Sequence, residues 1–412
     1  IERRLDQRVV ELTRGGTGGF GLPGTIGLAG AAPLPTADAA MLSFLVQRDR
    51  VCVVWLTGWG ERGVLELSGL PGLSGRIATL GTLLSKSADR AAAGTPSVAA
   101  VEELSACLVG QLPDAVTRCH RLVIVPDGCL ATVPFEVLRV RGRRLVETHE
   151  IRYVPSMSFA ELVAAREARR ATPYMPLLAI GNPALAHCNA ANGAASNSPL
   201  QVALRSARGD ERTSWAPLPG AARELAMVEQ LYGLEEGQSL HTLAAASVQH
   251  VRDLSEDGTL LRAKALLFST HGYLDPVDPN RSGIVLAAGE NEENVIRASE
   301  ISSWELACDL VFLSACDTGR AQFQSGEGLL GVPLAFMMAG SRANVQTLWP
   351  IHDAASAVFV ARFFELYREC DDAAAALTAV KREFLAGQHG ADCADAAYWA
   401  PFLLYGFSVD RT

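Results

Sequence analysis

The chain has 412 residues, so two or more packed units are expected, because single domains usually contain about 100–200 residues. Hydrophobic residues make up 49% and charged residues 20%, and the formal net charge of -9 argues against direct nucleic-acid binding, which normally needs a basic surface. No apolar run reaches the roughly 18 residues that a bilayer span needs, and the N-terminus lacks a signal peptide. We therefore expect a cytoplasmic protein that does not enter a membrane.

The nine cysteines are scattered and form no Cys-x-x-Cys pair, so the sequence predicts neither a metal site nor a redox motif. Such a distribution is typical of free thiols in a reducing compartment. No cofactor is indicated. The chain begins with Ile1 rather than Met, which suggests a processed chain with a domain missing upstream.

The first part of the chain is predicted to be a flexible segment, residues 1–40, followed by a compact unit, residues 41–155. Residues 13–40 are rich in Gly, Pro and Ala, and their glycines follow no strand, so a phosphate-binding loop is not favoured. The unit begins with a meander of three strands and continues with two helices and two further strands. These elements are expected at 41–46, 51–57, 63–67, 74–92, 97–112, 121–125 and 146–154.

The remainder, residues 156–412, alternates between helices and strands after a helix from Ser156 to about 170 and an Asn-rich and Ser-rich loop at 184–216. Helices are expected at 219–232, 247–256, 327–339, 354–370 and 372–386, and strands at 263–269, 309–314, 343–349 and 402–407. Alternation of this kind predicts an α/β fold, with a mostly parallel sheet covered by helices.

Two of these strands end in residues that can carry chemistry. The apolar strand at 263–269 is followed by His271 and Gly272, and the apolar strand at 309–314 is followed by Cys316. Ligands of open α/β sheets bind outside the carboxyl ends of the strands, so neighbouring strands would bring both side chains to one crevice. The two residues lie 45 positions apart, close to the spacing of about 50 found in caspases.

A thiolate and an imidazole at one site would suit nucleophilic catalysis. The thiolate is the attacking species, and the imidazole can generate it and later protonate the leaving amine. The backbone N–H groups of Gly272 and Cys316 are candidates for an oxyanion hole. From the residues alone the alternative stays open, because a lone cysteine is more often inert core and a lone histidine more often structural.

Several further motifs resemble the CHAT family of clan CD cysteine peptidases, relatives of caspases and separases. In chain order they are Val125–Gly128, Val133–Glu136, Tyr153–Ser156, Leu218–Ala221, His271–Gly272, Ser314–Gly319, Gly326–Gly331, Ala339–Arg342, Leu348–Pro350 and Tyr398–Phe402. The resemblance implies a caspase-like fold in which residues 41–155 form a degenerate, inactive copy and residues 156–412 form the peptidase domain. It also implies that His271 is the general acid/base and Cys316 the nucleophile.

Asp353 is the candidate specificity residue. It follows Trp349-Pro350, in a segment similar to the one whose acidic residue in separases lines the pocket for a basic P1 side chain, the residue before the cleaved bond. The alternative is that Asp353 only caps the helix it precedes. Two weaker candidates for substrate binding are Asp317, which can instead hold the turn after the nucleophile, and Glu327, which can instead favour a helix N-terminus.

The sequence therefore predicts a cysteine endopeptidase that cleaves specific proteins after a basic residue, in bacterial defence or signalling. Its partners would be a protein substrate and a regulatory protein or sensor domain. The alternative is a non-catalytic scaffold or adaptor with the same fold, although the presence of both His271 and Cys316 speaks against it. Arg205, Arg208 and Arg212 in the 184–216 loop suggest self-cleavage there, against the alternative of a passive surface insertion.

Overall fold

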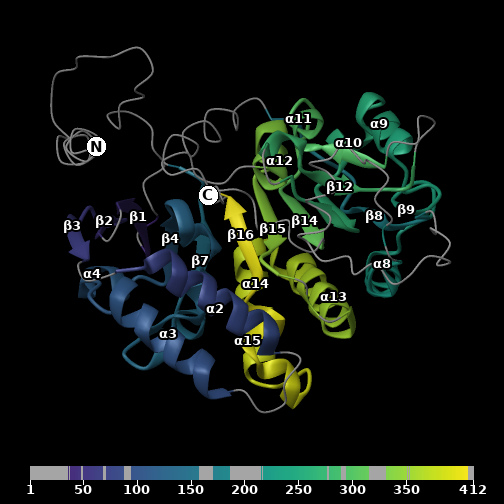
Figure 1. Cartoon of the computed structure of the whole chain (residues 1–412). Helices are drawn as coiled ribbons and strands as arrows, with labels where there is room; N and C mark the ends of the chain where they lie inside the picture. Colours follow the sequence, from purple (N-terminus) through teal and green to yellow (C-terminus); the bar gives the residue numbers. More distant parts are fainter. Residues whose placement is uncertain are drawn as a thin grey trace, which may run out of the picture.

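The centre of the molecule is a β-sheet of eleven strands (Figure 1). The computed structural model describes residues 36–406 except 37, 48–49, 68–70, 88–93, 157–169, 186–214, 216, 276–277, 289–293, 315–330, 350 and 352. The strand order is β3-β2-β1-β4-β7-β16-β15-β14-β10-β8-β9, and seven of the ten neighbouring pairs are parallel. The predicted α/β fold with a mostly parallel sheet is confirmed.

The strands fall into two sets that meet in the middle of the sheet. The first set is β1 (Ala39–Gln47), β2 (Arg50–Thr57), β3 (Arg62–Leu67), β4 (Arg121–Val125) and β7 (Glu150–Tyr153). The second set is β8 (Leu178–Pro183), β9 (Leu240–Leu243), β10 (Ala265–Ser269), β14 (Leu310–Ser314), β15 (Ala343–Thr347) and β16 (Phe402–Gly406). Strands β1, β2 and β3 form the predicted antiparallel meander.

Apolar residues on both faces of the central strands explain why helices cover the sheet on two sides. In β10, Leu267 belongs to one core cluster, whereas Leu266 and Phe268 belong to the other. In β14, Phe312 and Val311 divide in the same way. This alternation is the period of two that a strand buried on both faces must have.

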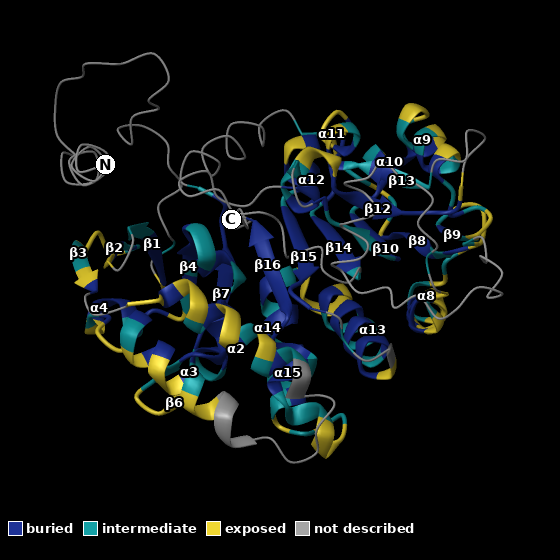
Figure 2. Ribbon diagram, viewed as in Figure 1, coloured by how far each residue is buried: buried dark blue, intermediate teal, exposed yellow. Residues whose placement is uncertain are grey.

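The helices form two layers, one on each face of the sheet (Figures 1 and 2). One layer contains α2 (Leu73–Ser87), α3 (Gly94–Leu108), α4 (Asp114–Thr117), α5 (Leu145–Thr148), α8 (Pro219–Tyr232), α13 (Asp353–Cys370), α14 (Ala373–Leu385) and α15 (Ala396–Trp399). The other contains α9 (Val248–Glu256), α10 (Thr259–Arg262), α11 (Ala298–Ile301) and α12 (Val332–Ala339). Burial is deepest along the sheet between them.

Smaller elements lie around this frame. A three-stranded sheet of β11 (Gly272–Tyr273), β12 (Gly283–Val285) and β13 (Val295–Arg297) follows β10, and β5 (Arg139–Val140) and β6 (Arg143–Arg144) form a hairpin. The 3-10 helices are η1 (Gly128–Thr132), η2 (Phe135–Val137), η3 (Pro279–Arg281) and η4 (Ala391–Ala394).

One predicted strand is partly wrong. Residues 146–154 were expected to be extended, but the chain forms the helical turn α5 before entering β7. The cause is local: the Glu147 carboxylate turns back and accepts a hydrogen bond from the Arg144 N–H at 2.6 Å, which stabilises the first turn of a helix. The predicted helix after Ser156 and most of the 184–216 loop, including its three arginines, lie outside the described residues.

Candidate active site

The predicted catalytic histidine lies where β10 leaves the sheet. Thr270 N–H donates to the Ser314 carbonyl at 3.2 Å, which extends the contact between β10 and β14 by one residue. The carbonyl of His271 then accepts a hydrogen bond from Val285 N–H at 2.9 Å, which ties it to β12. The His271 backbone is thus fixed between the large sheet and the small one, and its side chain is half-buried.

The strand that leads to the predicted nucleophile is the parallel neighbour of β10. Ser269, at the end of β10, lies opposite Ser314, at the end of β14. His271 and Cys316 each follow their paired serine by two residues. Cys316 itself, with Asp317 and Glu327, lies outside the described residues, so the dyad stays a prediction.

Gly272 was predicted to donate its N–H to an oxyanion. It lies opposite Ile284 in the antiparallel pair of β11 and β12. Because the bond from Val285 N–H to the His271 carbonyl flanks this position, Gly272 belongs to a non-hydrogen-bonded pair. Its N–H group therefore points away from β12 and does not bond to it. An oxyanion donor on this strand would need this orientation.

Trp215 is a neighbour of His271 that the sequence did not single out. The two ring centroids lie 5.2 Å apart, with the ring planes tilted by 35°. Trp215 comes from the segment just before α8, within the region predicted to be a loop. An aromatic ring in this position limits the orientations that the imidazole can take.

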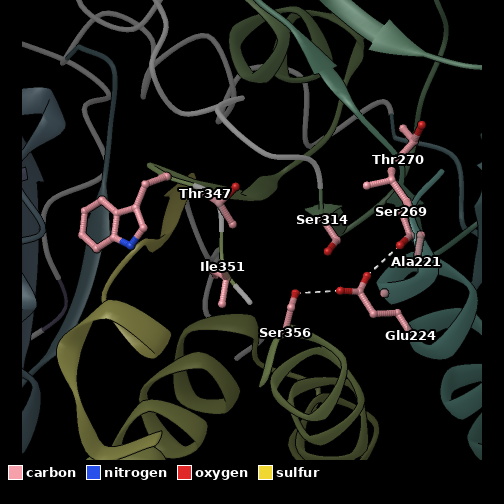
Figure 3. Close-up of a pocket in the computed structure, with 11 residues that line it drawn as sticks. Ala221, Glu224, Ser269, Thr270, Ser314, Thr347, Ile351 and Ser356 are labelled. Carbon is pink, nitrogen blue, oxygen red and sulfur yellow. Dashed lines mark hydrogen bonds between the residues drawn. The ribbon is translucent and has the colours of Figure 1, made fainter. Parts of the chain in front are cut away.

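A pocket lies beside the ends of β10, β14 and β15 (Figure 3). The empty space in it is about 410 Å3, open solvent at its mouth included. Residues from α8, from α13 and from the strand ends and the segments that follow them line it. They are Leu218, Gly220, Ala221, Glu224, Ser269, Thr270, Ser314, Thr347, Trp349, Ile351 and Ser356.

Glu224 is the charged residue among the described lining residues of this pocket. It extends from α8 and is 3% exposed. Its carboxylate accepts hydrogen bonds from the hydroxyl groups of Ser269 and Ser356, each at 2.6 Å (Figure 3). The sequence did not single out Glu224, because a glutamate beside Arg223 in an amphipathic helix is expected to face solvent.

Asp353, the predicted specificity residue, is the first residue of α13. The same helix presents Ser356 to the pocket three residues later. The Asp353 side chain lies outside the described part of the structure, so its role in substrate binding stays a prediction.

Five of the described cysteines have thiols unlike an activated catalytic thiol. Burial raises the pKa of the Cys308 thiol to about 12, and burial also raises the pKa of four others, Cys52, Cys119, Cys370 and Cys393. Thiols with raised pKa values are protonated at neutral pH and react slowly with electrophiles.

The described residues contain no cluster of three or more His, Cys, Asp or Glu side chains that could hold a metal ion. Among the helices of the described ranges, none combines the length and apolarity that a bilayer span requires.

The fold, with β10 and β14 as parallel neighbours within its sheet, belongs to the caspase-like class of folds. The structure of Saccharomyces cerevisiae separase in complex with securin aligns with a TM-score of 0.51 and 12% sequence identity, over 90% of this chain and 30% of that chain. A second structure of the same complex gives 0.51 and 11%. At this identity the likeness concerns the fold alone.

Within that class, the CHAT domain family model matches residues 98–407, and the chain belongs to this family. The match begins within the predicted amino-terminal unit. Among curated proteins, tetratricopeptide repeat protein 28 from Homo sapiens is 23% identical over 327 residues, and its counterpart from Mus musculus is 24% identical over 334 residues. Each alignment covers 71% of this chain but only 12% of the relative's length.

Proposed function

We propose that this chain is a cysteine endopeptidase with Cys316 as nucleophile and His271 as general acid/base. The observation that carries the proposal is the register of β10 and β14, in which Ser269 and Ser314 are paired two residues before the histidine and the cysteine. Parallel neighbours deliver their following residues to the same edge of a sheet, where α/β proteins bind ligands. Membership of the CHAT family supports the same assignment.

In the proposed reaction the Cys316 thiolate attacks the carbonyl carbon of the scissile peptide bond. The backbone N–H groups of Gly272 and Cys316 stabilise the oxyanion, and protonated His271 gives its proton to the leaving amine. Water, deprotonated by His271, then attacks the thioester and releases the new carboxyl end. No cofactor is needed for these steps.

The substrate would be a specific protein cleaved after a basic residue, with Asp353 facing that residue as the sequence predicts. We further propose that a partner protein or sensor domain controls the activity, in the cytoplasm, in bacterial defence or signalling. Two findings support protein-based control: the similar curated relatives are named for tetratricopeptide repeats, and the similar separase is in complex with securin.

Labelling with a tagged peptide chloromethylketone that carries arginine at P1 tests the dyad. We expect one label per chain, at Cys316, with no label in Cys316→Ala and a labelling rate at least about 100-fold lower in His271→Ala. Cys370→Ser is the matched control, because Cys370 is an exposed thiol outside the proposed site and its replacement should change nothing.

Two results would contradict the peptidase. Labelling of Cys316 that does not depend on His271 would indicate an incidental reactive thiol. A folded protein that takes no label at Cys316 would favour the non-catalytic scaffold.

A further inference from the structure

We propose that Trp215 is a positioning residue for the reaction: its indole ring holds the imidazole of His271 in one orientation and stabilises the protonated form that His271 takes during catalysis. This inference rests on the proposed peptidase and goes beyond it, because it adds a residue of the segment before α8 that neither the motifs nor the comparisons single out.

The two rings lie within contact range of each other. Their centroids are 5.2 Å apart and their planes are tilted by 35°, inside the roughly 4.5–7 Å over which aromatic rings attract each other. Both residues are half-buried, so water competes less with the contact than it would on an exposed surface. An indole attracts a cation more strongly than other aromatic side chains do, at up to about 6 Å from the ring centroid. The distance therefore suits a neutral imidazole and an imidazolium alike.

The main chain of His271 is fixed, but this alone does not fix the ring. Val285 N–H donates to the His271 carbonyl at 2.9 Å, which holds the backbone against β12. The torsion that turns an imidazole about its bond to Cβ is broad and has two wells, so the backbone leaves open which way the ring faces. Ring nitrogens form hydrogen bonds in the plane of the ring. A contact with the ring face therefore restricts the rotation and is compatible with the hydrogen bonds that the imidazole makes.

Trp215 is anchored to the strand that carries His271, because α8 is attached to β10. The Ser269 hydroxyl, at the end of β10, donates to the Glu224 carboxylate of α8 at 2.6 Å. Helix α8 begins at Pro219, four residues after Trp215, and proline fixes φ at this first helical position. The indole and the imidazole are thus carried by one framework.

The charge on His271 changes during the proposed reaction. When the Cys316 thiol gives its proton to the imidazole, a thiolate and an imidazolium form, and the imidazolium later passes the proton to the leaving amine. The face of an indole is the negative pole of its quadrupole, so it attracts the imidazolium more than the neutral ring. The contact therefore favours the ion pair, which is the state in which the sulfur can attack.

The first test observes the contact by NMR in the full chain carrying Cys316→Ala, with isotope-labelled histidine rings. The signal of His271 is the one that disappears in His271→Ala. Protons over the face of an indole are shifted upfield by its ring current, so we expect Trp215→Leu to move this signal downfield and Trp215→Phe to keep part of the upfield shift. A His271 signal that is the same in Trp215→Leu as in the unchanged protein would overturn the inference.

Trp59→Leu is the matched control. Trp59 is 51% exposed and lies on the turn between β2 and β3, at the end of the sheet far from β10. The same substitution there should leave the His271 signal where it is.

The second test measures the rate at which Cys316 is alkylated by two reagents, iodoacetamide and the chloromethylketone with arginine at P1. We expect Trp215→Leu to slow both reactions about 5- to 10-fold, Trp215→Phe to slow them about twofold, and Trp59→Leu to slow neither. Because iodoacetamide carries no peptide, a loss confined to the chloromethylketone would show that Trp215 binds the substrate, and it would overturn the inference.

The double variant with His271→Ala shows whether Trp215 acts through the histidine. In that background we expect Trp215→Leu to leave the slow residual rate unchanged, because a residue that works through another has no effect without it. A further loss as large as that of the single variant would indicate a general structural role and overturn the inference.

Fluorinated tryptophans at position 215 separate charge from shape, and they keep the test decisive if Trp215→Leu does not fold. Fluorine withdraws electron density from the ring face with little change in size. We expect the alkylation rates to fall stepwise with one, two and three fluorine atoms, to about a fifth of the starting value. Equal rates across the series would contradict the stabilisation of the imidazolium.

Failure of the peptidase and failure of this inference give different results. Alkylation of Cys316 that does not depend on His271 would reject the peptidase, while a His271 signal that follows Trp215 would still support its hold on the imidazole. Alkylation that depends on His271 but ignores Trp215 would leave the peptidase standing and overturn the inference.

Discussion

His241, on the edge strand β9, is a buried histidine whose pKa is lowered. It is 1% exposed, and its Nδ1 lies 3.0 Å from Nε2 of His250, on α9. Its own Nε2 is buried without a hydrogen-bond partner among the described residues. Burial first, and then the charge of His250, lower the pKa of His241 below its ordinary value of 6.5, against a smaller opposing effect of Glu236.

This pKa shift predicts a loss of stability in mild acid. Because the folded pKa is below 6.5, the unfolded chain binds more protons between the two values, so the free energy of unfolding falls as the pH decreases through 6.5. The slope from this residue is at most about 1.4 kcal/mol per pH unit. Urea unfolding of His241→Gln between pH 7.5 and 5.0 should show a shallower decline than the unchanged chain, and an unchanged slope would contradict the assignment.

At the scale of residues, the sequence singles out His271 and Gly272, whose catalytic roles stay predictions, but not Glu224 or Trp215. A histidine that ends an apolar strand stands out in its own segment. The significance of Glu224 depends instead on Ser269 and Ser356, which lie 45 and 132 positions away and become its neighbours only when α8 and α13 pack on the sheet. No local pattern encodes such a contact.

At the scale of elements, a buried ion pair links α14, from the carboxyl-terminal half of the chain, to η2, from the amino-terminal half. The Lys381 ammonium group donates to Glu136, in η2, at 2.6 Å, and the Tyr153 hydroxyl donates to the same carboxylate at 2.6 Å. Desolvation lowers the pKa of Lys381 even though Glu136 opposes the shift, and desolvation raises the pKa of Tyr153 well above its usual value. The pair therefore exists in an environment that disfavours either charge alone.

Removing one partner of this pair should be severe. Lys381→Met would leave the Glu136 carboxylate buried without its cation, and we expect a loss of about 3–5 kcal/mol in the free energy of unfolding. The double variant Lys381→Met/Glu136→Gln is the control, because glutamine still accepts from Tyr153 and carries no charge. It should recover part of the loss in urea unfolding, whereas a double variant no more stable than the single one would show that packing, not charge, is responsible.

The sequence predicted most of the longer elements and missed the short ones. Helices α8 and α13 follow their periodic apolar patterns to within a residue or two. The strand β8 was missed because only a few apolar residues separate Pro176 from the Gly181-Asn182-Pro183 turn signal. The four-residue strand β9 and the small sheet after His271 are too short for any period to be seen, since their pairing depends on neighbours far along the chain.

At the scale of the whole molecule, the parallel pair of β7 and β16 joins the two sets of strands into one sheet. We call this pair the join. Tyr153 lies opposite Tyr405 in the register, and their rings stack with centroids 5.3 Å apart. Every described residue of β16 is buried. The amino-terminal strands thus continue the sheet that carries the proposed active site, and they do not form a separate body beside it.

Residues 156–412 produced alone should therefore fold poorly or self-associate. Without β7, the backbone of β16 would become an unprotected sheet edge flanked by apolar side chains, the kind of edge that pairs with another chain. Light scattering should detect larger species than the full chain forms at the same concentration. Adding residues 36–155 as a second polypeptide is the control and should restore the smaller species, while a stable monomer of 156–412 alone would contradict the prediction.

The join also bears on how such a chain can be used or inactivated. A protease cut or an engineered fusion point that separates the two sets of strands would remove more than a dispensable amino-terminal unit. It would expose the edge of β16 in the middle of the sheet, near the pocket, and this edge could pair with another chain. Aggregation and loss of the pocket would then occur together.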